Sequence, residues 1–203
     1  MNSDVALDGE PVVGSFTVDG LTYAVTDESH VELVGVSSDW QQVTSSQEGE
    51  GFRVAPMLAS GPDGAAGLAL PGSVTYEGAD YALASIAPYA FYLSGVTDVT
   101  LPATVTDVDE RAFRSSDVEN VDVADNNPAY SSFDGALYSA GLTSLLLIPG
   151  GRQGAVRIPS QAADVPASAF SHCALVDAIS VDAGGAHLSS WEGLLYDADG
   201  TTL

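Results

Sequence analysis

The chain has 203 residues, of which 28 are acidic and five basic, so its formal net charge at pH 7 is −23. A surface this negative repels phosphate backbones and anionic lipid, which excludes nucleic acid and membranes as expected partners. Hydrophobic residues make up 45% of the chain, too many for a disordered acidic chain. Cys173 is the only cysteine, which excludes an internal disulfide, and no run of apolar residues is long enough to predict a membrane span.

The first residues lack the basic start and the apolar stretch of a secretory signal. We expect residues 1–13 to be a disordered leader. Either the protein is cytosolic, or a signal was removed before this chain was made.

Residues 14–66 are predicted to form an N-terminal β-hairpin cap. Two runs of alternating apolar residues flank Asp19-Gly20, a dipeptide that favours a tight hairpin turn. A further strand pattern follows at 31–36, and the Gly-rich stretch after it is interpreted as loops around one short strand. Trp40 lies in this stretch, and we interpret it as a core residue rather than an exposed aromatic that stacks on a sugar. Such a cap would shield the open strand edge of the first repeat.

Two motifs recur along the rest of the chain. An aliphatic residue followed four positions later by Ala-Phe occurs at 86–91, 108–113 and 165–170. The pattern aliphatic-x-x-aliphatic-x-aliphatic begins soon after each, at Val96, Val118 and Val176. The alternation in the second pattern predicts a short strand, and the phenylalanine is expected to fill the space beneath it. Because no single unit can bury its own apolar side, the units are expected to stack on one another.

A longer phrase is repeated at a constant offset of 58 residues, since 130–145 returns in altered form as 188–203. Each copy is interpreted as an inserted hairpin, with the turn of the first at 139–141 and that of the second at 197–200. The second copy reaches Leu203 before the counterpart of Leu146 appears. We therefore expect a truncated repeat array whose last hairpin is its softest part, with weak self-association through the open solenoid end.

These motifs resemble those of the BspA-type leucine-rich repeat family of bacterial surface proteins. The resemblance covers about 68–203 and includes the insertion N-P-x-Y-S-S-x-D-G-x-L-Y at 127–138. It implies a mainly β fold with short helical or 3-10 turns: a leucine-rich-repeat solenoid of about three units with inserted hairpins and an N-terminal β cap. The repeats would then occupy 67–203. The third unit departs from the pattern, because Ala162 replaces Val105 and weakens the packing there.

The same resemblance bears on Cys173 and its neighbour. Family members carry Cys or Asn near this position, which implies a small buried side chain. His172 is then a turn residue and not a ligand.

No catalytic or phosphate-binding motif is present, and the three histidines are not in a metal-ligand spacing. We therefore expect no catalytic residues, no metal and no cofactor. The acidic cluster Asp107, Asp109 and Glu110 is interpreted as a solvated turn that pairs with Arg111 and Arg114. The sequence Asp197-x-Asp199-Gly200 resembles the start of a calcium loop, but turn formation explains it better.

The exposed strand face is the expected binding surface of a solenoid. Aligning the strands places one outward row at Ala69, Thr100, Asp122, Leu147, Arg157 and Ser180. A second row contains Asp98, Asn120 and Ala178. From these rows we predict the following ligand-binding residues: Asp98, Thr100, Asn120, Asp122, Arg157 and Ser180.

The family resemblance, together with the repeat surface and the acidic exterior, implies a non-enzymatic recognition or adhesion module, located outside the cell or on the bacterial surface. Its expected partner is a host or bacterial surface protein or a glycan. One alternative is a structural spacer within a larger surface protein. Another is a polysaccharide-active β-solenoid enzyme, for which Arg157 is the only cation predicted on the strand face and Asp122 its nearest candidate partner.

Overall fold

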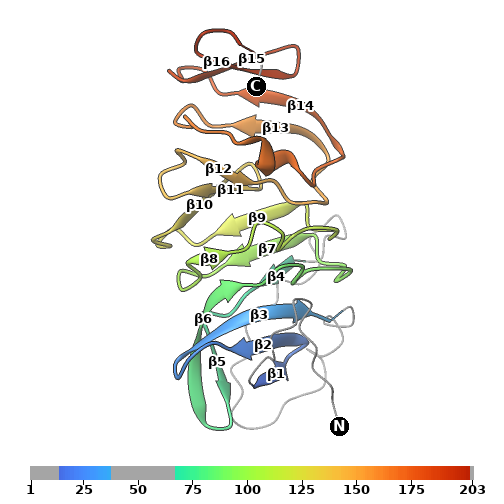
Figure 1. Ribbon diagram of the computed structural model, residues 1–203, viewed down its shortest axis with the longest axis vertical. Coiled ribbons are helices and arrows are strands. Elements are labelled where there is room, and N and C mark those ends of the chain that lie inside the picture. Colours follow the sequence, from blue (N-terminus) through green and yellow to red (C-terminus); the bar gives the residue numbers. More distant parts are fainter. Residues whose placement is uncertain (1–13, 38–66, 202–203) are drawn as a thin grey trace.

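The structure is a computed structural model that describes residues 14–37 and 67–201. The chain forms an elongated stack of short strands, with the N-terminal hairpins at one end and the last hairpin, β15–β16, at the other (Figure 1). The expected leader at 1–13 and Trp40 both lie outside the described residues. Within the described ranges, no helix has the length and apolar character needed to cross a membrane.

The N-terminal end is one sheet in the order β1-β2-β3-β6-β5, with β8 also paired to β6. Its strands are β1 (Ser15–Val18), β2 (Leu21–Val25), β3 (His30–Val36), β5 (Ser73–Tyr76), β6 (Ala79–Ile86) and β8 (Asp107–Val108). The hairpin predicted at Asp19-Gly20 is confirmed, since β1 and β2 are antiparallel and both turn residues have positive φ. Because β3 pairs in parallel with β6, the cap sheet continues directly into the first repeat.

The repeated strands form a parallel ladder, as their sequence pattern predicts. It contains β4 (Gly67–Ala69), β7 (Asp98–Leu101) and β9 (Asn120–Val123) in one sheet, and β13 (Gly154–Ile158) and β14 (Val176–Val181) in another. Val99 lies beside Val121, and both are buried, while the next residue of β9, Asp122, is exposed. One face of each strand therefore enters the core and the other remains at the surface.

The Ala-Phe turns stack on the opposite side of the core. The rings of Phe91 and Phe113 lie parallel with centroids 4.9 Å apart, and their residues are 0% and 2% exposed. Phe170 ends the 3-10 helix η1 (Ala167–Phe170), is half-buried and packs at the C-terminal end. It does not touch Phe113, because the backbone of Ile148 and Gly150 lies between their turns: Ile148 donates its N–H to Ala169, and a Cβ on Gly150 would lie 2.8 Å from the Phe113 carbonyl oxygen.

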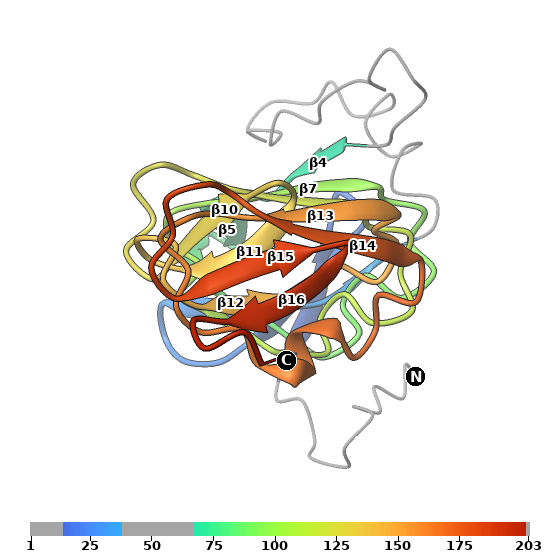
Figure 2. The same cartoon turned by 90° about the horizontal axis from the view of Figure 1, so that it is seen from above.

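An inserted sheet divides the core into two parts. It contains β10 (Tyr130–Phe133), β11 (Ala136–Ser139) and β12 (Leu145–Leu147). Seen along the stack, it runs from the side of β7 and β13 toward the side of η1 (Figure 2). Leu137 packs in the N-terminal cluster, whereas Ala136 and Tyr138 pack in the C-terminal one. Both faces of β11 are therefore buried, as in a strand that runs through a core.

Two details of this insertion differ from the sequence-based expectation. The predicted β11–β12 hairpin is present, but a further strand, β10, precedes it through a tight turn at Asp134-Gly135. Leu147 was expected in the outward row and is instead buried in the N-terminal cluster. Because β12 belongs to the inserted sheet, aligning Leu147 with the parallel strands was wrong.

The 58-residue offset is a structural repeat. In the second copy the hairpin is formed by β15 (Leu188–Trp191) and β16 (Leu194–Asp197), with its turn at Glu192-Gly193 rather than at the predicted 197–200. In the first copy Val121 donates its N–H to the carbonyl of Gly135 at 2.9 Å, and in the second Ile179 donates to Gly193 at 3.0 Å. The serine hydroxyls of β10 and β15 likewise accept from the strands beside them, at Val123 (3.1 Å) and Val181 (2.9 Å). Each hairpin is thus attached to the strand before it by the same bonds.

Replacing Phe113 by alanine should lower the free energy of unfolding by about 3–5 kcal/mol, because the lost ring is fully buried and leaves a cavity. Phe170→Ala should cost less, since Phe170 is half-buried. Urea denaturation of both variants measures the difference. Equal losses would show that the two phenylalanines are equally buried and would contradict the packing described here.

Candidate functional site: the exposed strand face

The predicted binding residues all lie on strands of the parallel ladder: Asp98 and Thr100 on β7, Asn120 and Asp122 on β9, Arg157 on β13, and Ser180 on β14. Their register gives three neighbouring pairs: Asp98 with Asn120, Thr100 with Asp122, and Arg157 with Ser180. The structure therefore collects them in two groups, one on β7–β9 and one on β13–β14. The turn at Asp134-Gly135 lies between the groups and links them.

A chain of hydrogen bonds starts on β7 and crosses this link. Asn120 donates from Nδ2 to Asp98 Oδ1 at 2.9 Å and accepts at Oδ1 from Arg152 Nη1 at 3.0 Å. Arg152 Nη2 donates to Asp134 Oδ2 at 2.9 Å. Gly135 lets the Asp134-Gly135 turn lie against Asn120, because a Cβ at position 135 would collide with the Asn120 side chain. Sequence reasoning did not find Arg152 or Asp134.

The chain continues on β13 and β14. Asp134 Oδ2 also accepts from the backbone N–H of Arg157 at 2.8 Å, and Arg157 Nη2 donates to Asp182 Oδ1 at 2.8 Å. That hydrogen bond and the charge of Asp182 raise the pKa of Arg157, whose guanidinium lies 5.4 Å from the Phe133 ring centroid. The enzyme alternative made Asp122 the nearest candidate partner of Arg157, but the guanidinium pairs with Asp182 instead. We call the whole set the polar ladder: Asp98, Asn120, Arg152, Asp134, Arg157 and Asp182.

The Arg152 side chain reaches the polar ladder because two glycines precede Arg152 in the chain. Gly151 donates its N–H to the carbonyl of Val118 at 2.9 Å, and a Cβ on it would lie 2.6 Å from Asp117. The chain therefore passes close to the turn before β9, and the Arg152 side chain, 17% exposed, enters the ladder from there. The two adjacent glycines indicate in the sequence that the backbone approaches another segment closely. No local pattern indicates that Arg152 bonds to Asn120, which lies 32 residues earlier in the chain.

The side chains of the polar ladder hold one another in place. Each of its carboxylates accepts a hydrogen bond from a neighbouring amide or guanidinium group. Such side chains have little freedom, so the face presents fixed donors and acceptors. The exposed side chains of Asp122, Arg157 and Ser180 lie on the same strands.

A second column of polar groups lies inside the turns after the phenylalanines. The hydroxyl of Ser116 donates to the carbonyl of Phe113 at 2.7 Å, and the Cys173 thiol does the same toward Phe170 at 3.3 Å. Burial raises the pKa of Cys173, which keeps it as the thiol. Cys173 is thus the small buried residue expected, and His172 lies in the turn beside it.

The acidic cluster at 107–110 was predicted to be a turn paired with Arg111 and Arg114, and the structure agrees only in part. Asp109 pairs with Arg111 at 3.1 Å as expected, but Arg114 donates to the Tyr89 hydroxyl at 3.3 Å and lies over that ring. Asp107 belongs to strand β8 rather than to a turn. Strand β3 adds a third carboxylate, Glu32, whose pKa is raised by burial and by the charges of Asp107 and Asp109.

The described part of the chain contains no group of three or more His, Cys, Asp or Glu residues arranged to hold a metal ion. At the calcium-like sequence, Asp197 Oδ1 accepts from the backbone N–H groups of Asp199 and Thr201, at 3.0 and 2.8 Å. This is the local hydrogen bonding of a turn, as the sequence analysis favoured.

No profile of a known protein family matches the chain, and no curated protein matches it. Several solved structures are similar to it. A leucine-rich repeat protein from Eubacterium ventriosum is 25% identical, with a TM-score of 0.44; the match covers 59% of this chain and 30% of that one. One from Bacteroides capillosus is 16% identical, with a TM-score of 0.48 and coverage of 83% and 98%. A leucine-rich cell surface protein from Faecalibacterium prausnitzii is 15% identical, with a TM-score of 0.40 and coverage of 96% and 61%.

The parallel ladder, the stacked rings of Phe91 and Phe113 and the repeated hairpin decide the fold. The chain is a leucine-rich-repeat solenoid. The solved structures to which it is similar are leucine-rich repeat proteins, one of them a cell surface protein. The solenoid spans about a third of the length of the Eubacterium protein and almost all of the Bacteroides capillosus protein.

Arg152→Met should destabilise the solenoid by about 2–3 kcal/mol, because the partly buried Asn120 and Asp134 lose a charged donor. Arg157→Met should cost less, since its pair with Asp182 is exposed to solvent. Urea denaturation at low and high salt measures both losses. A loss for Arg152→Met no larger than that for Arg157→Met would contradict the structural role of the ladder.

Glu32→Gln should stabilise the solenoid at neutral pH. The raised pKa means that the folded protein binds the Glu32 proton more tightly than the unfolded chain does, so Glu32 lowers stability as pH rises through that pKa. The advantage of glutamine should disappear in acid, where Glu32 is protonated in both states. Thermal unfolding of both proteins from acidic to neutral pH measures this difference, and an advantage that does not change with pH would contradict it.

Proposed function

We propose that the solenoid is a non-enzymatic recognition module of a bacterial surface protein. Its binding surface is the face formed by β7, β9, β13 and β14. The observation that carries this proposal is the polar ladder, which holds charged and amide groups in fixed positions along an exposed sheet. Groups fixed before binding lose little entropy on contact with a ligand, and this favours recognition.

The chemistry of the face indicates what it binds. Asp122 and Ser180 offer hydrogen-bonding groups of the kind that pair with the hydroxyls of a glycan or the side chains of a protein. The high negative charge of the chain favours a neutral or basic partner and opposes an anionic one. We therefore propose a host or bacterial surface protein or a glycan as the ligand. The resemblance to bacterial surface repeat proteins supports a location on the bacterial surface.

A structural spacer is the second candidate function. The ladder satisfies most of its charges internally, and no aromatic side chain lies in either of the two outward rows. Aromatic anchors carry much of the affinity of protein interfaces, so a face without them also suits a rigid support.

Glycan arrays and arrays of surface proteins, probed with the purified solenoid, distinguish the two functions. Under the recognition proposal the solenoid binds a defined ligand, and Asp122→Ala and Arg157→Ala each reduce that binding. The matched controls are Asp164→Ala and Arg114→Ala, which remove an exposed carboxylate and an exposed cation from other parts of the solenoid. Both controls should bind normally.

Silence across broad arrays would favour the spacer. Equal loss in the control variants would show that general charge, and not this face, carries the binding. Turnover of any polysaccharide would contradict the non-enzymatic proposal.

A further inference from the structure

Two large apolar side chains project from the turn that follows Phe91. Tyr92 is 54% exposed and Leu93, the next residue, is 64% exposed. The turn belongs to the side of the solenoid on which the Ala-Phe turns stack, opposite the strand face. We call the surface formed by Tyr92, Leu93 and the neighbouring Tyr89 and Arg114 the turn surface. Adjacent exposed apolar side chains of this size mark a site of interaction.

The backbone holds this turn in a fixed shape. Tyr92 donates its N–H to the carbonyl of Tyr89 at 2.9 Å, and Ser94 donates to that of Phe91 at 3.3 Å. The buried hydroxyl of Ser94 accepts from the N–H of Val96 at 3.3 Å. Because the turn is held by these bonds, its side chains lose little conformational entropy when a partner binds.

The conformation of Leu93 is unfavourable for a leucine. Its φ is 52°, a region in which Cβ approaches the following carbonyl oxygen. Ser115 has the same place in the next turn and a φ of 55°, and there Ser116 accepts from Val118 at the same 3.3 Å. Glycine would suit this position better. Since Leu93 is also exposed, neither the turn nor the core accounts for its side chain, and such outliers occur at functional sites.

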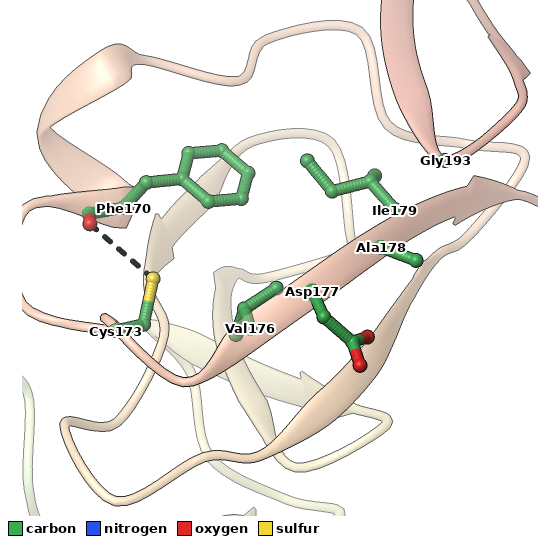
Figure 3. Close-up of a pocket in the computed structure, with 7 residues that line it drawn as sticks. All are labelled: Phe170, Cys173, Val176, Asp177, Ala178, Ile179 and Gly193. Atoms are coloured by element: carbon green, nitrogen blue, oxygen red, sulfur yellow. Dashed lines mark hydrogen bonds between the residues drawn. The ribbon is translucent and has the colours of Figure 1, made fainter.

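The other two Ala-Phe turns carry polar residues at these positions. In the third unit they are Ser171 and His172, and the Cys173 thiol closes that turn by its hydrogen bond to the carbonyl of Phe170 (Figure 3). In the second unit the first position is Arg114. The apolar pair is therefore confined to one of the three turns, so the repeat by itself does not require it.

Arg114 adds a cation beside the apolar pair. The rings of Phe91 and Phe113 stack, so the side chains that follow them lie on neighbouring turns. Arg114 Nη1 donates to the Tyr89 hydroxyl at 3.3 Å, and its guanidinium carbon lies 5.9 Å from that ring centroid. Each of the other three described arginines pairs with an aspartate, whereas Arg114 has no ion pair within the described ranges. Its guanidinium is thus held in place with N–H groups left to donate.

We propose that the turn surface docks a protein segment in which a carboxylate stands beside an aliphatic or aromatic side chain. The apolar side chain packs on Tyr92 and Leu93, and the carboxylate accepts hydrogen bonds from Arg114. Tyrosine and arginine are among the residues that carry most of the affinity in protein interfaces. The turn surface is separate from the strand face, so its partner is independent of the ligand proposed for that face.

The chemistry of the turn surface favours a protein segment over other occupants. A sugar laid on Leu93 would lose hydrogen bonds between its hydroxyls and water without replacing them. A second copy would bring a further net charge of −23 against the first. A partner with one carboxylate at the contact avoids this repulsion, because salt screens distant charges while the contact with the guanidinium is direct.

The test selects peptides from a random dodecapeptide phage library on the immobilised full chain. We expect the enriched peptides to carry Asp or Glu close in sequence to a large apolar residue. Fluorescence anisotropy of their synthetic forms should show binding weakened about tenfold or more by Leu93→Asn and by Arg114→Gln. The matched controls are Leu175→Asn, at a leucine that is 57% exposed, and Arg157→Gln, at an exposed arginine of the strand face. Both controls should bind normally.

A reversal of charge sharpens the comparison. Peptides in which lysine replaces the carboxylate should bind Arg114→Glu more tightly than they bind the original chain. Leu93→Asn should not lower the urea midpoint, because asparagine tolerates a positive φ, so its weaker binding cannot come from unfolding.

Four results would overturn the proposal. The first is a selection without enriched peptides, and the second is enriched peptides that bind Leu93→Asn as tightly as the original chain. The third is loss of binding in Arg157→Gln, which would place the peptides on the strand face. The fourth is another occupant of the turn surface: a second copy, seen as concentration-dependent association that Leu93→Asn abolishes, or an acidic sugar, seen as binding of sialyllactose that Arg114→Gln abolishes.

Discussion

Stacking of incomplete units is the constraint on which this solenoid depends. Each short strand has one apolar side, and a three- or four-residue strand cannot cover that side by itself. Val99 is buried because Val121 lies beside it, and Phe91 is buried because Phe113 stacks on it. The bonds between units are local, so the structure is long and narrow.

The inserted hairpins follow from the same constraint. The first hairpin crosses the core and gives apolar residues to both halves, which explains why β11 is buried on both faces. It also displaces the regular repeat, so the phenylalanine column stops at Phe113 and the chain returns through Gly150 and Gly151. That return places Arg152 beside Asn120. The polar ladder is therefore a consequence of the insertion, and the binding face proposed here is rigid at the point where the repeat is interrupted.

The two ends of the solenoid are built differently. The N-terminal end is a sheet in the order β1-β2-β3-β6-β5, in which β3 pairs with β6 of the first repeat. The C-terminal hairpin repeats the bonds of the first one but has an apolar outer face.

The sequence by itself determined the repeat, the alternating strands, the tight turn at Asp19-Gly20 and the 58-residue offset, because these depend on local spacing and on turn preferences. It also placed Asp98, Asn120 and Arg157 on one face. Only the tertiary structure decided that Leu147 is buried, that Arg157 pairs with Asp182, and that Arg152 and Asp134 complete the ladder. Those contacts join residues 18 to 32 positions apart across an insertion. Their geometry depends on how the hairpin crosses the core, which no local pattern specifies.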